Sequence, residues 1–339
     1  MRGIDIERVS TWLIQEIDGV EPPLHFELIA GGHSNLTFKA TDAAGRRMVV
    51  RRPPLGHVLA TAHDMSREHR IVSAVGPTAV PVAPTLGLCE DVEVNGAPFY
   101  VMEFVDGVVL DSRDKAEQLP MPMRAVTAEH LIDVLGDLHA VDVDEVGLGD
   151  LARRDGYIER QLKRWSKQWE LSKTRELPAI EEVEERLKSR VPVQQGTAIV
   201  HGDYRLGNCL VDPDAGRVNA VLDWELCTLG DPLADVGYLS VYWTDPGQVA
   251  RRANDPTAAG GFPSMADMIE RYSSRTGRDV HGIEYYVAFS SWRLAVISEG
   301  VYARYANGVM ADESADIEQF KIGVEHLAEA ALAAARQLG

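Results

Sequence analysis

The chain is organised around residues 199–210, which read I-V-H-G-D-Y-R-L-G-N-C-L. Two short apolar runs enclose a polar loop, so the pattern predicts a strand, a loop and a second strand. The loop carries a carboxylate, Asp203, and an amide, Asn208, spaced as D-x-x-x-x-N. Phosphoryl transfer needs that pair, because an acid must hold the attacking hydroxyl and an oxygen ligand must hold magnesium. Arg205, between the two, is a third candidate catalytic residue.

A second acidic segment follows at residues 221–225, which read V-L-D-W-E. Its apolar start predicts a strand that delivers Asp223 to the same loop. Taken alone, H-G-D is a weak signal. The combination H-G-D-x-x-x-x-N, then a strand, a turn, a strand and D-x-E, is a strong one.

Composition narrows the range of functions. The chain carries 52 acidic and 34 basic residues, a formal net charge of −18. Nucleic-acid binding by counterion release needs clustered Lys and Arg, and no basic stripe is present, so we expect no nucleic-acid partner. The N-terminus lacks the apolar segment of a secretory signal, and no apolar run is long enough to span a bilayer. A cytoplasmic chain is also indicated by the odd, widely spaced cysteines, which predict reduced core thiols: Cys89, Cys209 and Cys227.

The first 105 residues predict a small lobe made mainly of strands. Asp106-Gly107 breaks the strand pattern, so we place a lobe boundary between residues 105 and 106. Asn95-Gly96 is a strong signal for a hairpin turn. The expected strands cover residues 25–29, 47–51 and 99–105, and the expected amphipathic helices cover residues 5–18 and 64–75.

Three features of this lobe are candidate nucleotide contacts. Gly32, Ser34 and Asn35 lie at an expected hairpin tip rich in small donors, which can cover phosphates, although an ordinary β-turn is the alternative. Arg51 ends a strand, where it either reaches the phosphates or remains a solvated strand end. Glu68 is expected near the inward face of a helix, which indicates an ion pair unless it is a surface carboxylate.

Residues 106–339 predict a larger, mainly helical lobe. Asp231 followed by a proline fits a helix N-cap and first helical position. Asp235, in the first turn of that helix, is expected to turn inward toward the Asp203 loop. The Pro- and Gly-containing segment 244–263 predicts a long loop or lid. The expected helices cover 127–140, with Thr127 as cap, 154–172, 179–190, 264–276, 283–305 and 311–337.

These residues together resemble the aminoglycoside phosphotransferase/choline kinase superfamily, and the similarity spans nearly the whole chain. Residues 62–68 and 289–294 look closest to the kinase-like domain fused ahead of acyl-CoA dehydrogenases in some larger proteins. The resemblance implies an α+β, two-lobed, protein-kinase-like fold. A small N-terminal lobe with an antiparallel sheet, residues 1–105, would bind nucleotide, and a larger C-terminal lobe, residues 106–339, would hold the catalytic and substrate groups.

The resemblance also implies roles for the motif residues. Asp203 would be the catalytic acid/base or hydroxyl-orienting carboxylate. Asn208 and Asp223 would hold magnesium, assisted by Glu225. Arg51 stands where protein kinases carry a strand lysine, a departure that matters because a planar guanidinium fork is not a point charge.

The remaining implied roles concern nucleotide binding and support. Arg51 would pair with Glu68, and Met102 would lie beside the adenine base. Backbone hydrogen bonds to adenine would come from Glu103 and Val105. Structural support for the catalytic loop would come from His201, Asp231 and Asp235.

The predicted activity is transfer of the γ-phosphoryl group of ATP, or of GTP, to a hydroxyl group of a small molecule, with Mg²⁺. The alternatives are an aminoglycoside 3'-type phosphotransferase and a catalytically silent nucleotide-binding module. A metal-dependent hydrolase is a weaker alternative, because no H-E-x-x-H or other paired-histidine ligand set is present.

The expected acceptor is a hydroxy acid or a hydroxyacyl thioester. Residues 283–305 place Arg293 among aromatic side chains that include Trp292, Tyr285, Tyr286 and Tyr302. A cation in such a setting can clamp a carboxylate or a phosphate while the rings cover an apolar chain. An aminoglycoside would be repelled by that cation. The alternative is that Arg293 pairs with a structural acid such as Glu299 or with a residue across the lobe.

Overall fold

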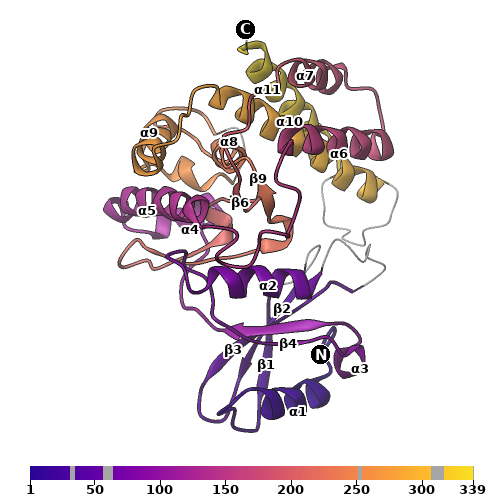
Figure 1. The fold of residues 1–339 in the computed structure, drawn as a ribbon, viewed down its shortest axis with the longest axis vertical. Helices are drawn as coiled ribbons and strands as arrows, with labels where there is room; N and C mark the ends of the chain where they lie inside the picture. The colour runs from indigo at the N-terminus through magenta and orange to yellow at the C-terminus, as the bar shows by residue number, and fades with distance from the viewer. Residues whose placement is uncertain (31–34, 56–63, 251–253, 307–316, 339) are drawn as a thin grey trace.

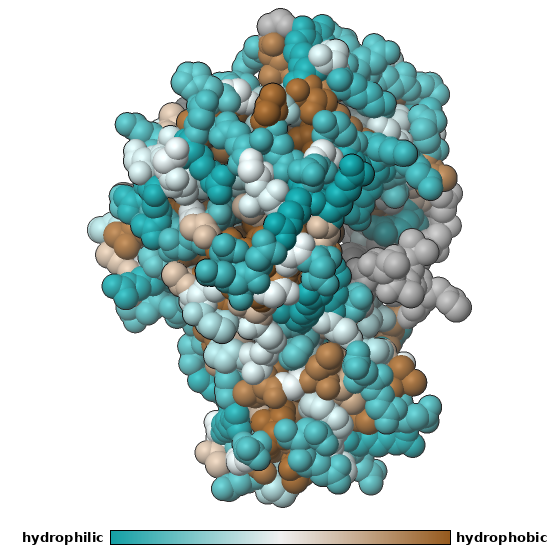
Figure 2. Space-filling model, in the orientation of Figure 1, coloured by the Kyte–Doolittle hydropathy of each residue, from teal (hydrophilic) through white to brown (hydrophobic). Residues whose placement is uncertain are grey.

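The structure is a computed structural model that describes residues 1–30, 35–55, 64–250, 254–306 and 317–338. Figure 1 shows a strand-rich lobe at one end of the long axis and a helical lobe at the other. This arrangement confirms the predicted two-lobed α+β fold. Hydrophilic side chains cover most of the face drawn in Figure 2. Among the helices of these ranges, none is long and apolar enough to cross a bilayer.

The smaller lobe is built on a five-stranded antiparallel sheet with the order β1-β2-β3-β5-β4. Its register places Arg51 beside Thr37 on one side and beside Tyr100 on the other. One face of the sheet packs on helix α1, where Val9 and Leu13 are fully buried. The elements are α1 (Ile6–Glu16), β1 (His25–Ala30), β2 (Leu36–Thr41), β3 (Arg47–Arg52), α2 (Met65–Val75), β4 (Thr85–Cys89), α3 (Val92–Asn95) and β5 (Phe99–Glu103).

Helix α2 lies between the sheet and the larger lobe (Figure 1). It begins at Asp64, whose carboxylate accepts a hydrogen bond from the Arg67 backbone N–H. Its apolar residues Ile71 and Val75 belong to the core of the larger lobe. The same buried face, three residues before Ile71, presents Glu68, which is 2% exposed and accepts a hydrogen bond from the Tyr100 hydroxyl of the sheet at 3.2 Å. The helix thus carries a buried carboxylate to the junction of the two lobes.

The larger lobe surrounds two small antiparallel strand pairs, β6 with β9 and β7 with β8. The loop between β6 and β7 contains the D-x-x-x-x-N motif. The helices are α4 (Arg113–Gln118), α5 (Met121–Ala140), α6 (Tyr157–Ser172), α7 (Pro178–Ser189), α8 (Leu233–Val241), α9 (Met265–Thr276), α10 (Ile283–Ala306) and α11 (Ile317–Arg336). The strands are β6 (Ala198–Val200), β7 (Cys209–Val211), β8 (Val218–Val221) and β9 (Thr228–Gly230), with short 3₁₀ turns η1 (Leu206–Asn208), η2 (Trp224–Leu226) and η3 (Pro256–Ala259).

Helix α10 forms the centre of this lobe and packs on both α8 and α11. Its residues Tyr286, Phe289 and Trp292 are almost completely buried. Close approach of α8 and α10 depends on Gly237, because a Cβ atom built there would lie 2.5 Å from the Tyr286 carbonyl carbon. Backbone atoms at that distance cannot move aside as a side chain can, so the two helices would have to separate.

Two local sequence predictions are wrong. Asn95-Gly96 does not form a hairpin turn: it ends the short helix α3, and Gly96 takes the left-handed conformation of a C-cap, with φ 71°. Thr127 does not cap a helix, because α5 begins at Met121 and Thr127 is fully buried inside it. Asn95-Gly96 therefore marks the end of a helix instead of a hairpin turn, and Thr127 lies within a helix that begins earlier than predicted.

Two other predictions differ from the structure in part of their range. The described part of the C-terminal helix begins at Ile317, and residues 311–316 of the predicted helix lie outside the described residues. The predicted loop 244–263 contains η3. Asp255 accepts hydrogen bonds from Thr244 Oγ1 at 2.6 Å and from the Thr257 backbone at 3.0 Å.

We predict that Gly237→Ala lowers the free energy of unfolding by about 1–3 kcal/mol, the usual effect of an overpacked core. The reason is the clash between α8 and α10. Chemical denaturation followed by circular dichroism measures it. Gly323→Ala in α11 is the matched control, since nothing lies within 4 Å of its added Cβ. Equal stability of the two variants would contradict the account of this helix contact.

Candidate active site

The loop after β6 is held by a buried carboxylate. Asp235, fully buried in the first turn of α8, accepts hydrogen bonds from the backbone N–H groups of His201 at 2.6 Å and Gly202 at 2.8 Å. His139 Nε2 lies 3.3 Å from the same carboxylate, and His139 Nδ1 lies 2.8 Å from the Tyr272 hydroxyl. Burial alone would raise the pKa of Asp235, but hydrogen bonding and charge from His139 lower it. Asp235 therefore faces the loop as the sequence predicted.

His201 connects this loop to the second acidic segment. Its Nε2 lies 2.9 Å from the Leu222 carbonyl oxygen, and its Nδ1 accepts a hydrogen bond from the Asp203 backbone at 3.2 Å. The imidazole also packs against Trp224, with ring centroids 4.9 Å apart. A single buried side chain therefore fixes the position of Asp203 relative to that of Asp223. His201 therefore has a structural position, with both ring nitrogens in contact with the backbone.

Asp203 and Asn208 lie in direct contact. The Asn208 Nδ2 donates to the main-chain oxygen of Asp203 at 2.8 Å and to its Oδ2 at 2.6 Å. With both amide hydrogens facing Asp203, the side-chain oxygen of Asn208 is left to act as a ligand. Arg205 Nε lies 3.4 Å from Asp203 Oδ1, so the third candidate of this motif also belongs to the site.

Asp223 follows β8 in the left-handed conformation, with φ 64°, a value that non-glycine residues rarely adopt. Its Oδ1 lies 2.6 Å from Arg51 Nη2, and Arg51 Nε lies 2.9 Å from Glu68 Oε1. The predicted Arg51–Glu68 ion pair is therefore present. The guanidinium fork contacts two carboxylates at once, one from each lobe, which a lysine ammonium with its single nitrogen would do less rigidly.

The acids of this junction have altered ionisation. Burial raises the pKa of the Glu68 carboxyl although Arg51 opposes the shift. Burial raises the pKa of Glu225 to about 7, and the negative charge of Asp223 is the second cause of this shift. For Arg51, burial favours a lower pKa, but the charges of Glu68, Tyr100 and Asp223 raise it. The Arg51 guanidinium therefore stays positively charged, and both Glu68 and Asp223 pair with it.

Asn35 brings the start of β2 to the same place. Its Nδ2 lies 3.3 Å from Glu68 Oε2 and 3.5 Å from Glu225 Oε2. Gly32 and Ser34, the other residues of the predicted tip, lie outside the described residues. Asn35 therefore connects the smaller lobe to the acidic segment that carries Glu225.

The predicted adenine-contacting residues lie at the end of β5. Glu103 is the last residue of the strand, and its N–H donates to the Pro84 oxygen at 2.8 Å. The Glu103 carboxylate pairs with Arg46 at 2.6 Å. Met102 is half-buried beside it, and Val105 follows the strand and lies outside the sheet. Any adenine contact by Glu103 would use its carbonyl oxygen, because its N–H is already bonded.

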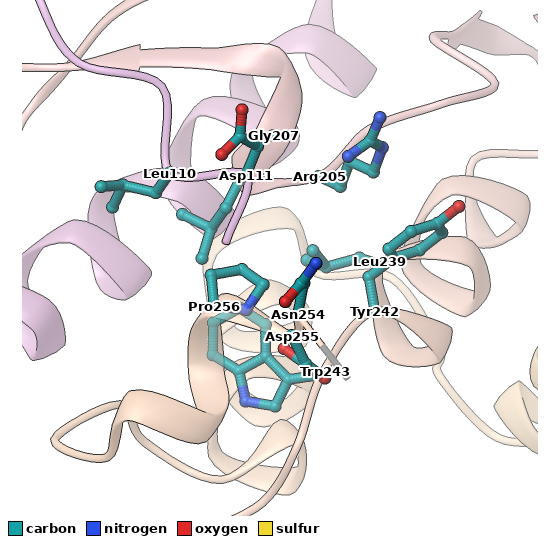
Figure 3. Close-up of a pocket in the computed structure, with 11 residues that line it drawn as sticks. Leu110, Asp111, Arg205, Gly207, Leu239, Tyr242, Trp243, Asn254, Asp255 and Pro256 are labelled. Carbon is teal, nitrogen blue, oxygen red and sulfur yellow. The ribbon is translucent and has the colours of Figure 1, made fainter. Parts of the chain in front are cut away.

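A cavity of about 260 Å³ opens beside the motif (Figure 3). Arg205 lies at one side of it, 5.1 Å above the centre of the Tyr242 ring. Asp111 lies at another side and pairs with Lys115 at 2.7 Å. The remaining walls combine apolar side chains with the polar residues Asn254 and Asp255; the apolar residues are Leu110, Leu206, Leu239, Trp243 and Pro256. Sequence reasoning missed this cavity because its walls come from segments that lie far apart along the chain.

Arg293 has different neighbours from those predicted. Its guanidinium carbon lies 4.6 Å from the Tyr238 ring centre and 5.8 Å from that of Trp165. Its Nη2 donates to the Gly202 carbonyl oxygen, and the side chain is 3% exposed. The predicted aromatic partners on its own helix face the core or lie elsewhere: Tyr285 donates to Leu187 O, Tyr286 to Asp231, Trp292 to Ile180 O, and Tyr302 stacks on Arg175.

Of the structural alternative for Arg293, a residue across the lobe is its partner, namely the Gly202 carbonyl, whereas Glu299 is not. Glu299 accepts hydrogen bonds from Thr174 and pairs with Arg175 at 3.2 Å. Asp231 lies one residue before the N-cap of α8, which is Pro232 rather than the predicted Asp231, but its Oδ1 still accepts from the Leu233 backbone N–H at 3.1 Å. Its other oxygen accepts from the Tyr286 hydroxyl at 2.7 Å, which connects α8 to α10.

The donor set can be compared with the needs of a magnesium ion. Asp223 supplies a carboxylate and Asn208 an amide oxygen, which are hard oxygen ligands. No group of three or more His, Cys, Asp or Glu side chains able to hold a metal was found within the described ranges. One or two protein ligands fit Mg²⁺, which commonly takes its remaining ligands from water and phosphate.

Solved structures show the class of fold. A Ralstonia eutropha protein, provisionally named an aminoglycoside phosphotransferase, is 36% identical with a TM-score of 0.83, over 98% of this chain and 99% of that one. The GDP complex of aminoglycoside 2'-phosphotransferase-IIIa has a TM-score of 0.63 and 14% identity, over 97% of this chain and 99% of that one. The fold is therefore the two-lobed one of these kinase-like enzymes.

Sequence comparison then gives the family. Residues 25–268 match the phosphotransferase enzyme family, so the chain belongs to that family. Acyl-CoA dehydrogenase family member 10 of Mus musculus is 36% identical over 84% of this chain, and acyl-CoA dehydrogenase family member 11 of Gallus gallus is 33% identical over 91%. The chain spans 27% and 40% of the lengths of these two relatives. The resemblance inferred from the motifs is confirmed.

The raised pKa of Glu225 predicts a pH effect on stability without metal or nucleotide. In the unfolded chain the carboxyl loses its proton near pH 4.5, whereas in the folded chain it keeps the proton until about pH 7. The folded state therefore loses stability as the pH rises between these values. We expect Glu225→Gln to melt roughly 2–4 °C above the wild type at pH 8 and at the same temperature at pH 4.5.

Differential scanning calorimetry over this pH range measures the effect. Glu185→Gln, at an exposed position of α7, is the control and should follow the wild type. A Glu225→Gln melting curve that runs parallel to the wild-type curve at every pH would contradict the raised pKa.

Proposed function

We propose that the chain transfers the γ-phosphoryl group of ATP, or of GTP, to a hydroxyl group of a small molecule. The observation that carries the proposal is the convergence of Asp203, Asn208, Asp223 and Arg51 at the junction of the lobes, with Asn208 Nδ2 2.6 Å from Asp203 and Arg51 2.6 Å from Asp223. This is the set of a base, two oxygen ligands and a phosphate-facing cation that phosphoryl transfer uses.

The residues have distinct roles in this proposal. Asp203 orients the acceptor hydroxyl and takes its proton at a carboxylate oxygen. Arg205, 3.4 Å from that carboxylate, places positive charge beside the transferring group. The Asn208 amide oxygen and the Asp223 carboxylate hold Mg²⁺, with Glu225 assisting. When bound, the metal supplies neutralisation of charge on the phosphate oxygens.

The nucleotide is expected between the lobes. Gly32, Ser34 and Asn35 would lie over the phosphates, and Arg51, held by Glu68, would contact them. The strand end at Met102, Glu103 and Val105 would face adenine. Relatives of the same fold support nucleotide use, because one was crystallised with GDP and a spectinomycin phosphotransferase with ADP.

Rearrangement at Arg51 is part of this proposal. In the structure, Arg51 Nη2 forms an ion pair with Asp223 Oδ1 at 2.6 Å. A metal ion on that oxygen would have to displace the guanidinium, which is then free to turn toward phosphate. The Arg51 Nε contact with Glu68 can remain during this change, because it uses another nitrogen of the fork.

The proposed acceptor is a hydroxy acid or a hydroxyacyl thioester. The cavity beside the motif has apolar wall residues such as Leu206, Leu239 and a cation, Arg205, at its side, which can hold an apolar chain with an anionic end. Asp111 and Asp255 also line it and would accept hydrogen bonds from hydroxyl groups of the acceptor. The names of the relatives, which refer to acyl-CoA dehydrogenases, support an acyl group. An aminoglycoside is the second candidate, because of the named activity of the 36% identical Ralstonia eutropha structure.

We predict that Asp203→Ala lowers turnover by about 10²–10⁴-fold, the usual contribution of a positioned proton acceptor. Nucleotide affinity should stay near that of the wild type, because Asp203 does not contact the Arg51–Glu68 pair. Release of ADP and binding of a fluorescent ATP analogue measure the two quantities. Turnover close to that of the wild type would remove Asp203 from the mechanism.

We predict that Asp223→Ala and Asn208→Ala each raise the magnesium concentration needed for half-maximal activity, by roughly tenfold or more, since each removes one oxygen ligand. ATP binding at high magnesium should change less. Magnesium titrations at saturating ATP measure the shift. Asp214→Ala, at an exposed carboxylate of the β7–β8 turn, is the control. Unchanged titrations in both variants would place the metal elsewhere.

The acceptor class is tested by comparing hydroxy acids, hydroxyacyl thioesters and kanamycin-type amines with ATP and Mg²⁺. We expect phosphorylation of acids or thioesters, because a cation beside the reacting centre repels a polycationic substrate. Mass spectrometry of the products identifies the phosphorylated hydroxyl. Efficient turnover of the amines, with none of the acids or thioesters accepted, would contradict this acceptor class and favour the antibiotic-modifying activity.

A further inference from the structure

Three arginines from three helices approach one another beside the catalytic loop. Arg67 belongs to α2, Arg164 to α6 and Arg293 to α10. Arg164 and Arg293 both contact the Trp165 ring, at 5.1 and 5.8 Å from its centre. Desolvation and the positive charges of Arg293 and Arg67 lower the pKa of the Arg164 guanidinium. The three charges are therefore near enough to repel one another.

None of the three forms an ion pair with a carboxylate within the described part of the chain. Arg67 donates to the Cys227 carbonyl oxygen at 2.8 Å, and Arg293 donates to the Gly202 carbonyl oxygen. The Nε of Arg293 is buried and has no hydrogen-bond partner among the described residues. Many other arginines do pair with acids, for example Arg46, Arg47, Arg51, Arg70, Arg113, Arg154, Arg175, Arg186, Arg271 and Arg275.

The like charges of the three arginines repel one another; solvent screens the charge of the exposed Arg164, but Arg293 is only 3% exposed. The chain has a net charge of −18, yet no carboxylate of residues 1–30, 35–55, 64–250, 254–306 and 317–338 forms an ion pair with these three cations. The faces of Trp165 and Tyr238 stabilise the guanidinium groups by about 0.5–2 kcal/mol each, but they do not neutralise charge. A carboxylate or phosphate would remove the mutual repulsion and would fit the planar forks of the arginines.

The cluster is connected to the reacting centre by stacked side chains. Arg205 stacks on Tyr242, and Tyr242 lies 5.1 Å from Tyr238, ring centre to ring centre. Tyr238 in turn lies under Arg293, which contacts Trp165. An acceptor whose hydroxyl group reaches Asp203 could therefore place a second, remote group near Arg164.

We propose that Arg67 and Arg164, with Arg293 at the buried base, form a subsite for an anionic group that the acceptor carries away from its reacting hydroxyl. The inference rests on the proposed phosphotransferase function and makes it more specific. The anionic group is a carboxylate of a free acid or a phosphate of the carrier in a thioester, two sources of the same chemistry. Arg164 and Arg67 are then specificity-determining residues.

The test is a binding measurement with the full chain, saturated with Mg²⁺ and ADP so that the nucleotide site is occupied. Isothermal titration calorimetry compares a free hydroxy acid, its uncharged amide, a hydroxyacyl-CoA and the same hydroxyacyl group on pantetheine, which has no phosphate. Arg164→Ala and Arg67→Ala are compared with Lys163→Ala, an exposed cation one residue before Arg164 on α6. Melting temperatures confirm that each variant folds.

We expect both arginine variants to weaken binding of an anionic probe by about 10–100-fold, the usual effect of losing a charged hydrogen bond. Binding of its neutral counterpart should not change, and Lys163→Ala should match the wild type. Dependence on the acid but not on the amide identifies a carboxylate, and dependence on the CoA ester but not on the pantetheine ester identifies a phosphate. Equal losses for charged and neutral probes, or no binding of any anionic probe, would overturn the subsite.

The same experiment separates this proposal from the proposed function. Arginine-dependent binding without phosphorylation of any probe would support the subsite and contradict the kinase activity. Phosphorylation of an anionic acceptor with an unchanged KM in Arg164→Ala and Arg67→Ala would support the kinase activity and overturn the subsite.

Discussion

The site depends on one buried carboxylate. Asp235 has no exposed surface, and it accepts the backbone N–H groups of His201 and Gly202 while His139 lies against it. A buried carboxylate is unfavourable without such donors, and backbone N–H groups without an acceptor are unfavourable too, so each fixes the other. Through this exchange the first turn of α8 sets the path of the loop that presents Asp203. His201 then carries the constraint on to the Leu222 carbonyl and so to Asp223.

The two lobes are joined by a second constraint, the guanidinium of Arg51. It contacts Glu68 of α2 and Asp223 of the larger lobe, and Thr37 Oγ1 lies 3.3 Å from its Nη1. In the proposed mechanism this contact is the one that metal and nucleotide would rearrange. Asp235 thus fixes the loop that carries Asp203, while Arg51 couples the larger lobe to the smaller one. Arginine suits this position because its fork serves two carboxylates from different nitrogens.

Much of this arrangement could be predicted from the sequence, because it depends on short-range patterns. The H-G-D-x-x-x-x-N loop, the strand before Asp223 and the inward turns of Glu68 and Asp235 all follow from local spacing. Arg293 shows the limit: periodicity placed it on the correct helix, but its partners Trp165 and Tyr238 belong to α6 and α8, and no local signal links those helices to it. The cavity beside Arg205 was missed for the same reason. The predictions for Asn95-Gly96 and Thr127 were wrong for a related reason. Asn-Gly occurs at helix C-caps as well as in hairpin turns, and Thr occurs inside helices as well as at their N-caps.

We propose that Asp235 positions a phosphoryl-transfer centre. The most direct measurement follows label from γ-³²P-ATP to a hydroxy acid or hydroxyacyl thioester in the wild type and in Asp235→Asn, with folding of both checked by circular dichroism. The substitution keeps the shape of the side chain but replaces an oxygen that accepts a backbone N–H with a donor, or weakens both bonds. The account predicts transfer to the acceptor in the wild type and a loss of at least about tenfold in the folded variant. Transfer at the wild-type rate in a folded Asp235→Asn, or no transfer to any hydroxyl acceptor by the wild type, would contradict it.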